Sequence, residues 1–296
     1  MSGTKQDNVT QQKKVVFPDL QEAFDGDEIA RLAMKSFKTL SLCCCCCLML
    51  AAASLTSTAQ AAGWGTIKGK FVVDGTAPTL PAVDASKEAY CVEHHPINQS
   101  VIVDDKGDLA NVVVFLRPAR GAKVDVHPDY AALKDQPVML DNKGCAFHPH
   151  IALVMAGQPF IVKNSDPIGH NTKTSLIKNA NFNQTIPANS ELPFKFSRAE
   201  AIPLPVDCSI HPFMHGFVLV KDDPYMVASA EDGTFEIKNV PAGKHEFEFW
   251  HEVPGRLKNL KFQGGSLNRQ GRAQLTIADG ETLDLGEIKV PASMLQ

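Results

Sequence analysis

The chain has 296 residues and a formal net charge of −4 at pH 7, and 44% of its residues are hydrophobic. It lacks the basic stripe that binding to nucleic acid requires, because phosphate contacts are made by clustered Lys and Arg. We therefore expect no nucleic-acid partner, and the slightly acidic balance is explained by ordinary solubility.

The N-terminal fifth of the sequence has the pattern of a secretory signal peptide. An apolar run without a charge covers residues 40–53, Lys35 and Lys38 precede it, and the small-x-small triplet Ala59-Gln60-Ala61 follows it. This order is typical of a signal peptide, and the run is too short to span a bilayer comfortably. We expect export to the periplasm or cell envelope of a bacterium, with no stable membrane span after cleavage. The remaining chain of about 235 residues can bury one large or two small cores.

Alternatives remain for this region. The apolar run could stay as an anchor, whereas a lipoprotein is disfavoured because Leu42, and not a small residue, precedes Cys43. The residues before Met34 are either an over-long gene start or a cytoplasmic extension, since "MKSFKTLSL" is by itself an ordinary signal-peptide start.

After residue 62, the sequence consists of short runs of β-branched and aromatic residues bounded by Gly, Pro, Asn and Asp, a pattern typical of β-strands. Several runs alternate strictly, as Phe194/Phe196 and Phe235/Ile237 do, so that one face of each strand is buried. Only residues 129–136 indicate a short helix. The sequence therefore predicts an all-β sandwich fold. The runs lie within residues 65–75, 111–118, 159–166, 193–197, 216–223, 233–243, 244–252, 272–280 and 283–290.

Cleavage of the signal peptide changes the number of cysteines. Residues 43–47 leave with it, and Cys91, Cys145 and Cys208 remain. In an oxidising compartment two of the three are expected to pair. Because Cys208 lies among candidate metal ligands, the expected disulfide is Cys91–Cys145.

Four histidines flank these two cysteines, and the expected disulfide would bring them near one another. One interpretation is an additional copper or zinc site that supports a reaction such as nitrite reduction. The favoured interpretation is surface and strand histidines beside a disulfide. A multi-copper enzyme is disfavoured, because His-x-His occurs only once. The four are His94, His95, His148 and His150.

The segment "DCSIHPFMHG", residues 207–216, gathers potential metal ligands. Cys208, His211 and Met214 follow one another at intervals of three residues. Thiolate and thioether are soft ligands and imidazole is intermediate, a set suited to copper. Structural zinc sites and iron–sulfur clusters usually require more cysteines than the one left free. A copper electron-transfer centre needs a second imidazole, and His170, 38 residues before Cys208, follows a predicted strand and supplies it.

Residues 221–227 are the expected domain boundary, because a new pattern of strands and turns follows them. Asp232-Gly233 and residues 241–243 form turns of a predicted hairpin. Its "DGTFEIKNVPAG" pattern resembles the carboxypeptidase regulatory-like module, a small transthyretin-type β-sandwich. We predict three parts: residues 1–61 are an extension and signal peptide, residues 62–222 a metal-binding domain, and residues 223–296 this module.

The sequence from about residue 100 to residue 222 resembles the cupredoxin (type 1 blue copper) family. The motifs that carry the resemblance are "NSDPIGHN" at the end of a strand, "CSIHPFMHG" and the strand "FVLV". The ligand spacing is most similar to the amicyanin-like members with a short loop. The resemblance implies a Greek-key β-sandwich that holds one type 1 copper ion. The implied ligands are His170, Cys208, His211 and Met214, with Asn171 tying the two ligand loops together by hydrogen bonds.

The resemblance also implies a carrier of single electrons and not an enzyme. The imidazole of His211 would reach the surface beside Pro212 and Phe213, and this small apolar port suits brief docking with a redox partner protein. Two alternatives are a copper-handling or structural envelope protein on the same scaffold and, less favoured, a copper enzyme. The axial ligand is Met214 or, as the less favoured alternative, His215.

Overall fold

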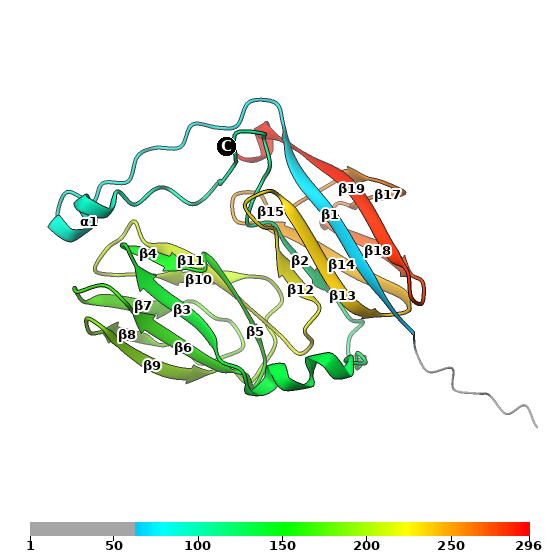
Figure 1. Cartoon of the computed structure of the whole chain (residues 1–296), viewed down its shortest axis with the longest axis horizontal. Helices are drawn as coiled ribbons and strands as arrows, with labels where there is room; N and C mark the ends of the chain where they lie inside the picture. Colours follow the sequence, from blue (N-terminus) through cyan, green and yellow to red (C-terminus); the bar gives the residue numbers. More distant parts are fainter. Residues whose placement is uncertain (1–62) are drawn as a thin grey trace, which may run out of the picture. The chain divides into compact units, whose positions relative to one another are not determined.

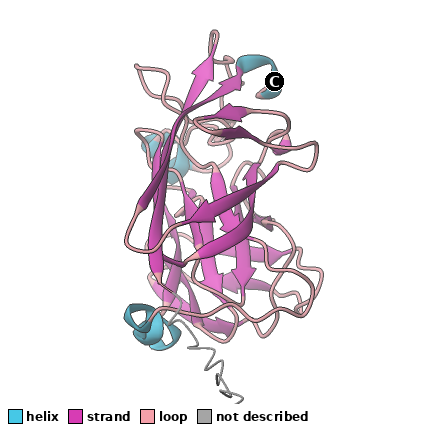
Figure 2. Cartoon of the chain, turned by 90° about the vertical axis from the view of Figure 1, so that its right-hand side faces the viewer, coloured by secondary structure: helices cyan, strands magenta, loops and turns pink. Residues whose placement is uncertain are grey.

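The computed structural model describes residues 63–296, which form nineteen β-strands and three short helices (Figure 1). Strands make up most of this part of the chain (Figure 2), so the predicted all-β class is observed. The expected extension and signal peptide, residues 1–61, lie outside the described residues. Within residues 63–296, no helix is long and apolar enough to cross a membrane. The helices are α1 (Ala89–His94) and the 3-10 helices η1 (Pro128–Asp135) and η2 (Ala292–Met294).

Strands β3 to β11 form two sheets that we call the ligand sandwich. One sheet has the order β5-β11-β10-β7-β8 and the other the order β4-β3-β6-β9. They share a buried cluster that includes Phe147 and Phe160 from one sheet and Val206 and Val218 from the other. Burial of this apolar surface holds the sheets together. The strands are β3 (Val138–Lys143), β4 (Ala146–His148), β5 (Ile151–Met155), β6 (Pro159–Asn164), β7 (His170–Thr174), β8 (Asn183–Ile186), β9 (Ser190–Lys195), β10 (Leu204–Asp207) and β11 (His215–Lys221).

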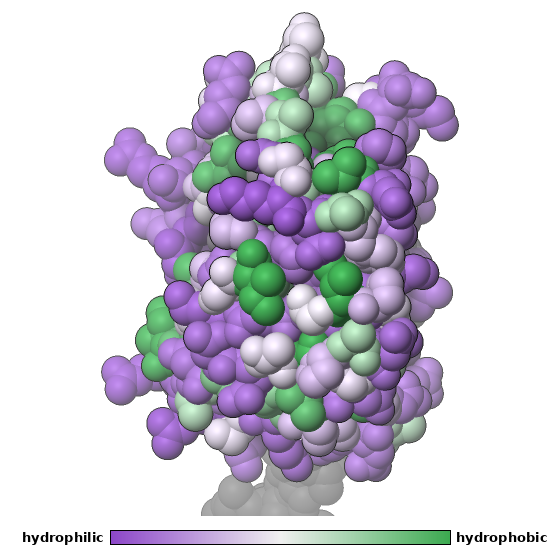
Figure 3. Space-filling view, turned by 90° about the vertical axis from the view of Figure 1, so that its left-hand side faces the viewer, coloured by the Kyte–Doolittle hydropathy of each residue, from purple (hydrophilic) through white to green (hydrophobic). Residues whose placement is uncertain are grey.

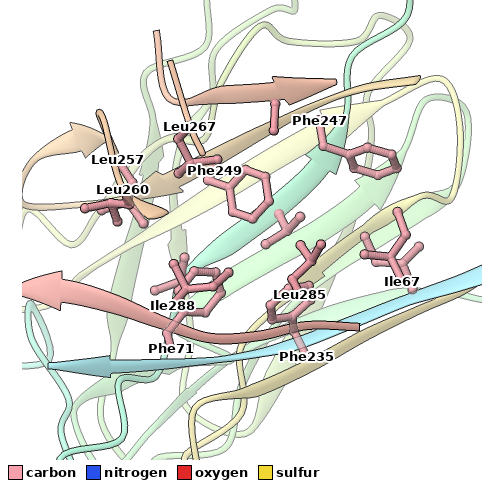
Figure 4. Close-up of a cluster of buried hydrophobic side chains, with 14 of the residues drawn as sticks. Ile67, Phe71, Phe235, Phe247, Phe249, Leu257, Leu260, Leu267, Leu285 and Ile288 are labelled. Carbon is pink, nitrogen blue, oxygen red and sulfur yellow. The ribbon is translucent and has the colours of Figure 1, made fainter. Parts of the chain in front are cut away.

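The remaining strands form what we call the companion sandwich. Its sheets have the orders β13-β1-β19 and β12-β2-β14-β15, and β18 pairs with β14. Aromatic side chains from both sheets fill its core (Figure 4), where Phe71 lies 5.1 Å from Phe235 and 6.2 Å from Phe249 between ring centroids. The strands are β1 (Trp64–Asp74), β2 (Val113–Leu116), β12 (Met226–Ala228), β13 (Thr234–Pro241), β14 (Gly243–His251), β15 (Gly255–Arg256), β16 (Lys261–Phe262), β17 (Gly265–Ser266), β18 (Arg272–Ile277) and β19 (Thr282–Pro291).

The strand pairing divides the chain differently from the predicted boundary after residue 222. Strand β1 pairs with β13 and β19, and β2 pairs with β12 and β14. Residues 64–74 and 113–116, which the sequence assigned to the metal-binding domain, therefore belong to the companion sandwich. The ligand sandwich is inserted between β2 and β12. Alternation within a strand shows that one face is buried, but it does not identify the neighbouring strand.

The hairpin expected after residue 231 is also different in the structure. Strands β13 and β14 follow each other directly, but β13 pairs with β1 whereas β14 pairs with β2, so they lie in different sheets. Gly243, with φ of 125°, begins β14 in a backbone conformation that other residues rarely adopt. The predicted short helix at residues 129–136 is observed as η1.

The two sandwiches meet through side chains of β2, β5, β11 and β14. Phe115, Ile151 and Leu219 belong to one buried cluster with Trp250. The ring of Trp250 packs edge-on against Phe217, with 5.0 Å between centroids. The companion sandwich thus packs directly against β11, the strand that follows the candidate ligand loop.

Candidate metal centre

The predicted ligands come from neighbouring positions at one end of the five-stranded sheet. His170 is the first residue of β7, and Cys208 follows the last residue of β10. Strand β10 lies between β7 and β11 and pairs with both. The loop from β10 to β11 therefore begins and ends beside His170.

Backbone hydrogen bonds close this ligand loop, residues 208–214. The N–H of Cys208 donates to the carbonyl of Met214 at 3.0 Å, and the N–H of Met214 donates to the carbonyl of His211 at 2.8 Å. Because each of these bonds spans a few residues, the three side chains are held on one short turn. The loop presents them without a long mobile connection.

The structure brings His170, Cys208 and His211 together. The Nδ1 atoms of the two imidazoles lie 3.0 Å apart, and the Cys208 Sγ lies 3.8 Å from the His211 Nδ1. All three side chains are buried, and their ligand atoms lie within 4.8 Å of one another. Two imidazole nitrogens and one sulfur directed at a common point can hold a metal ion.

The Cys208 sulfur accepts two backbone hydrogen bonds, from the N–H of Asn171 at 3.3 Å and from the N–H of His211 at 3.4 Å. Donors directed at one sulfur stabilise the negative charge of a metal-bound thiolate. The side chain of Asn171 also accepts a bond from the N–H of Ser209 at 3.0 Å. Asn171 therefore joins the two ligand segments, β7 and the ligand loop.

Burial keeps both imidazoles neutral. It lowers the pKa of His170 below its ordinary value, although the hydrogen bond to Asp166 acts in the opposite direction. Burial also lowers the pKa of His211, and the neighbouring His170 adds to this effect. Neutral imidazoles have the free lone pair that a metal requires.

Asp166 is a residue of the site that the sequence did not reveal. Its Oδ2 lies 2.8 Å from the Nε2 of His170. Although burial raises it, hydrogen bonds from Cys145, Gly144 and His170 bring the pKa of Asp166 below its ordinary value. A carboxylate at this distance requires Nε2 to donate, which leaves the Nδ1 lone pair of His170 directed at the site. The only sequence signal was its place in the same "NSDPIGHN" motif.

Met214 is buried, with 2% of its surface exposed, and belongs to the same apolar cluster as Cys208. His215 is half-buried at the start of β11, and its ring lies 5.8 Å from that of His150. The structure therefore places Met214 with the predicted ligands and His215 beside another histidine.

The four additional histidines do not form one group. His94, His95 and His148 are exposed and line a groove of about 710 Å³. His150 is buried apart from them, with its Nε2 2.8 Å from the Glu252 Oε2. Within residues 63–296, clusters of three potential ligands occur only around His170, and none contains these histidines. The predicted Cys91–Cys145 disulfide is present, and Cys208 is free.

The surface near His211 differs from the predicted port. The His211 side chain is only 5% exposed, whereas Ile210 beside it is 50% exposed. Pro212 is exposed and Phe213 is half-buried, packed against the core of the ligand sandwich. The imidazole is therefore covered, and its loop neighbours form the accessible surface. Seen from the α1 side, hydrophobic residues form small separate patches on a mainly hydrophilic surface (Figure 3).

No family model and no curated protein matches this chain. Among solved structures, it is similar to the Cu(I) form of a methionine-to-alanine mutant of amicyanin, at 18% identity and a TM-score of 0.26 over 29% of this chain and 82% of that one. It is also similar to the Cu(I) form of a second methionine-to-alanine mutant of amicyanin, at 16% identity and a TM-score of 0.27 over 38% of this chain and 99% of that one.

A third similar structure is the copper-containing nitrite reductase from Thermus scotoductus SA-01, at 21% identity and a TM-score of 0.27 over 35% of this chain and 24% of that one. These likenesses are weak, and the metal assignment that follows rests on the geometry of the ligands.

Proposed function

We propose that this protein binds one type 1 copper ion and carries single electrons between redox partners. The ligands are His170, Cys208 and His211, with Met214 as the axial ligand. The observation that supports this proposal is the buried set of two Nδ1 atoms and one Sγ, of which the nitrogens lie 3.0 Å apart.

The donor set fits copper better than other metals. Calcium and magnesium prefer oxygen ligands, and structural zinc usually takes further cysteines, whereas Cys208 is the one free cysteine among residues 63–296. Two imidazoles and a thiolate with a nearby thioether are typical of blue-copper centres. Bound copper would supply a one-electron couple between Cu(I) and Cu(II).

The residues of the chain supply a rigid frame for that couple. His170 is anchored at the start of β7, and the ligand loop is closed by the hydrogen bonds of Cys208 and Met214. A frame that does not move keeps the ligands in place when the charge on the metal changes. Such a frame suits a carrier more than an enzyme, since the buried ligands leave little room for a substrate.

We further propose that the protein is exported and that its redox partner docks on the ligand loop. Ile210 and Pro212 are exposed beside the covered imidazole of His211, with Phe213 next to them. A small apolar contact of this kind suits a brief encounter. The companion sandwich packs on the strand behind this loop and leaves the loop accessible.

Reversible electron transfer tests the carrier role. The copper-loaded protein, purified after export, is reduced and reoxidised in a voltammetric cell while its absorption is followed. We expect a single one-electron wave and full recovery of the oxidised spectrum over repeated cycles. Loss of copper on reduction, or the absence of a wave, would contradict the carrier and favour a copper-handling protein. Steady consumption of nitrite would favour an enzyme.

Replacing Met214 with Gln is expected to retain the blue colour and lower the reduction potential, because the axial ligand tunes the potential and an amide oxygen favours Cu(II) over Cu(I). The matched control is His215→Gln, which should leave the potential unchanged. Voltammetry of both variants checks this prediction. A shift in His215→Gln alone would identify His215 as the axial ligand.

A further inference from the structure

Asp166 accepts hydrogen bonds from four donors. Its Oδ1 accepts from the Tyr90 hydroxyl at 2.9 Å and from the N–H of Gly144 at 2.7 Å. Its Oδ2 accepts from the N–H of Cys145 at 2.9 Å and contacts the Nε2 of His170 at 2.8 Å. A carboxylate has about four such acceptor positions, so the orientation of the Asp166 side chain is fully determined.

Three of the four donors lie at the Cys91–Cys145 disulfide. Tyr90 immediately precedes Cys91 in α1, Gly144 immediately precedes Cys145, and Cys145 itself supplies the third. The disulfide connects segments that are 54 residues apart in the sequence. We call these donors and the disulfide the Cys91–Cys145 brace.

The turn that carries two of these donors has an unusual backbone. Gly144 and Cys145, between β3 and β4, have φ of 58° and 59°. Glycine adopts such a conformation readily, but a residue with a side chain does not. Cys145 is kept in this conformation while its sulfur is bonded to Cys91, and the conformation points its N–H at Asp166.

We propose that Asp166 is a positioning residue for the metal ligand His170, and that the Cys91–Cys145 brace holds Asp166 in place. The proposal rests on the copper function proposed above. It follows that the centre binds metal more tightly with the disulfide than without it. A chain exported to an oxidising compartment would then acquire its full affinity for copper only after this disulfide has formed.

The direct test compares Cu(II) affinity by chelator competition in the protein purified after export. Asp166→Asn should weaken binding by about 10- to 100-fold, the usual effect of losing a hydrogen-bond partner of a metal-binding histidine. The double variant Cys91→Ser/Cys145→Ser should weaken it by roughly tenfold. The matched control is Asp141→Asn, since this carboxylate binds Ser165 in the same region and makes no contact with His170.

A second measurement separates positioning from a general loss of stability. In the metal-free protein, nitrogen chemical shifts of the His170 ring report which nitrogen carries the proton. We expect the proton on Nε2 in the wild type and in Asp141→Asn. In Asp166→Asn the amide N–H can face the ring, and we expect part of the population to carry the proton on Nδ1.

The proposal is overturned if Asp166→Asn and the double variant bind Cu(II) as the wild type does, or if both leave the His170 tautomer unchanged. If the double variant does not fold, Tyr90→Phe takes its place, because it removes one donor of the brace and leaves the disulfide intact; a wild-type affinity and tautomer then overturn the brace. If the wild type binds no copper, the proposed function fails, but the tautomer of the metal-free protein still decides the role of Asp166.

Discussion

Replacing Cys208 with serine is expected to abolish the blue colour of the copper-loaded protein. The colour of such a centre arises from charge transfer between thiolate sulfur and Cu(II), and Cys208 is the one free cysteine among residues 63–296. The sulfur lies 3.8 Å from the His211 Nδ1 in a buried site, where a serine oxygen cannot provide a soft ligand. Visible absorption of wild type and variant after addition of one equivalent of Cu(II) checks this prediction.

The matched control for this experiment is Ser209→Ala. The hydrogen bond from Ser209 to Asn171 is donated by the backbone N–H, so it survives removal of the hydroxyl. We expect this variant to be as blue as the wild type. A Cys208→Ser protein that stayed blue would place the thiolate ligand elsewhere and contradict the assigned centre.

Replacing His251 with Gln is expected to protect the protein against acid. Burial lowers the pKa of His251 to about 4, from an ordinary value of 6.5. Below pH 6.5 the unfolded chain takes up a proton that the folded chain refuses until about pH 4, so the free energy of unfolding falls as the pH falls through this window. The loss amounts to about 3 kcal/mol, and a Gln side chain avoids it.

The effect of His251 concerns the junction between the sandwiches, because its neighbour Trp250 packs against Phe217 there. Urea unfolding at pH 7 and pH 4 measures the change in the free energy of unfolding of each protein. We expect the advantage of His251→Gln over the wild type to be larger at pH 4 by about 3 kcal/mol. An equal difference at both pH values would show that the histidine is protonated in the folded protein.

The opposite sign is expected for Asp223→Asn. Burial raises the pKa of Asp223 to about 6, from an ordinary value of 3.8. The folded chain therefore binds a proton before the unfolded chain does, and Asp223 stabilises the wild type as the pH falls from about 6 to 3.8. The advantage of Asp223→Asn over the wild type should be larger at pH 7 than at pH 4. The same urea experiment checks this, and a larger advantage at pH 4 would refute it.

The sequence predicted what depends on local pattern. Strict alternation located β6, β9, β11 and β13, because each buries one face. It did not show that β1 and β2 cross to the companion sandwich or that β13 and β14 separate. Strand partners are set by contacts between residues far apart in the sequence, and local periodicity carries no information about them.

The candidate site could be predicted as far as the chemistry of its side chains reaches. The spacing of Cys208, His211 and Met214 and the preceding His170 were sufficient to name the ligands. The role of Asp166 depends on a turn at Gly144–Cys145 and on α1, and neither indicates a metal site in the sequence. The burial of His211 was missed for a similar reason, since exposure is decided by the packing of the whole loop.

The most direct test of the central claim is a titration of the exported protein with Cu(II), followed by visible absorption and by metal analysis. The geometry of His170, Cys208 and His211 predicts an intense blue absorption that saturates at one copper per chain. A colourless protein, a protein that retains zinc in preference to copper, or saturation at two or more coppers per chain would contradict a single type 1 centre.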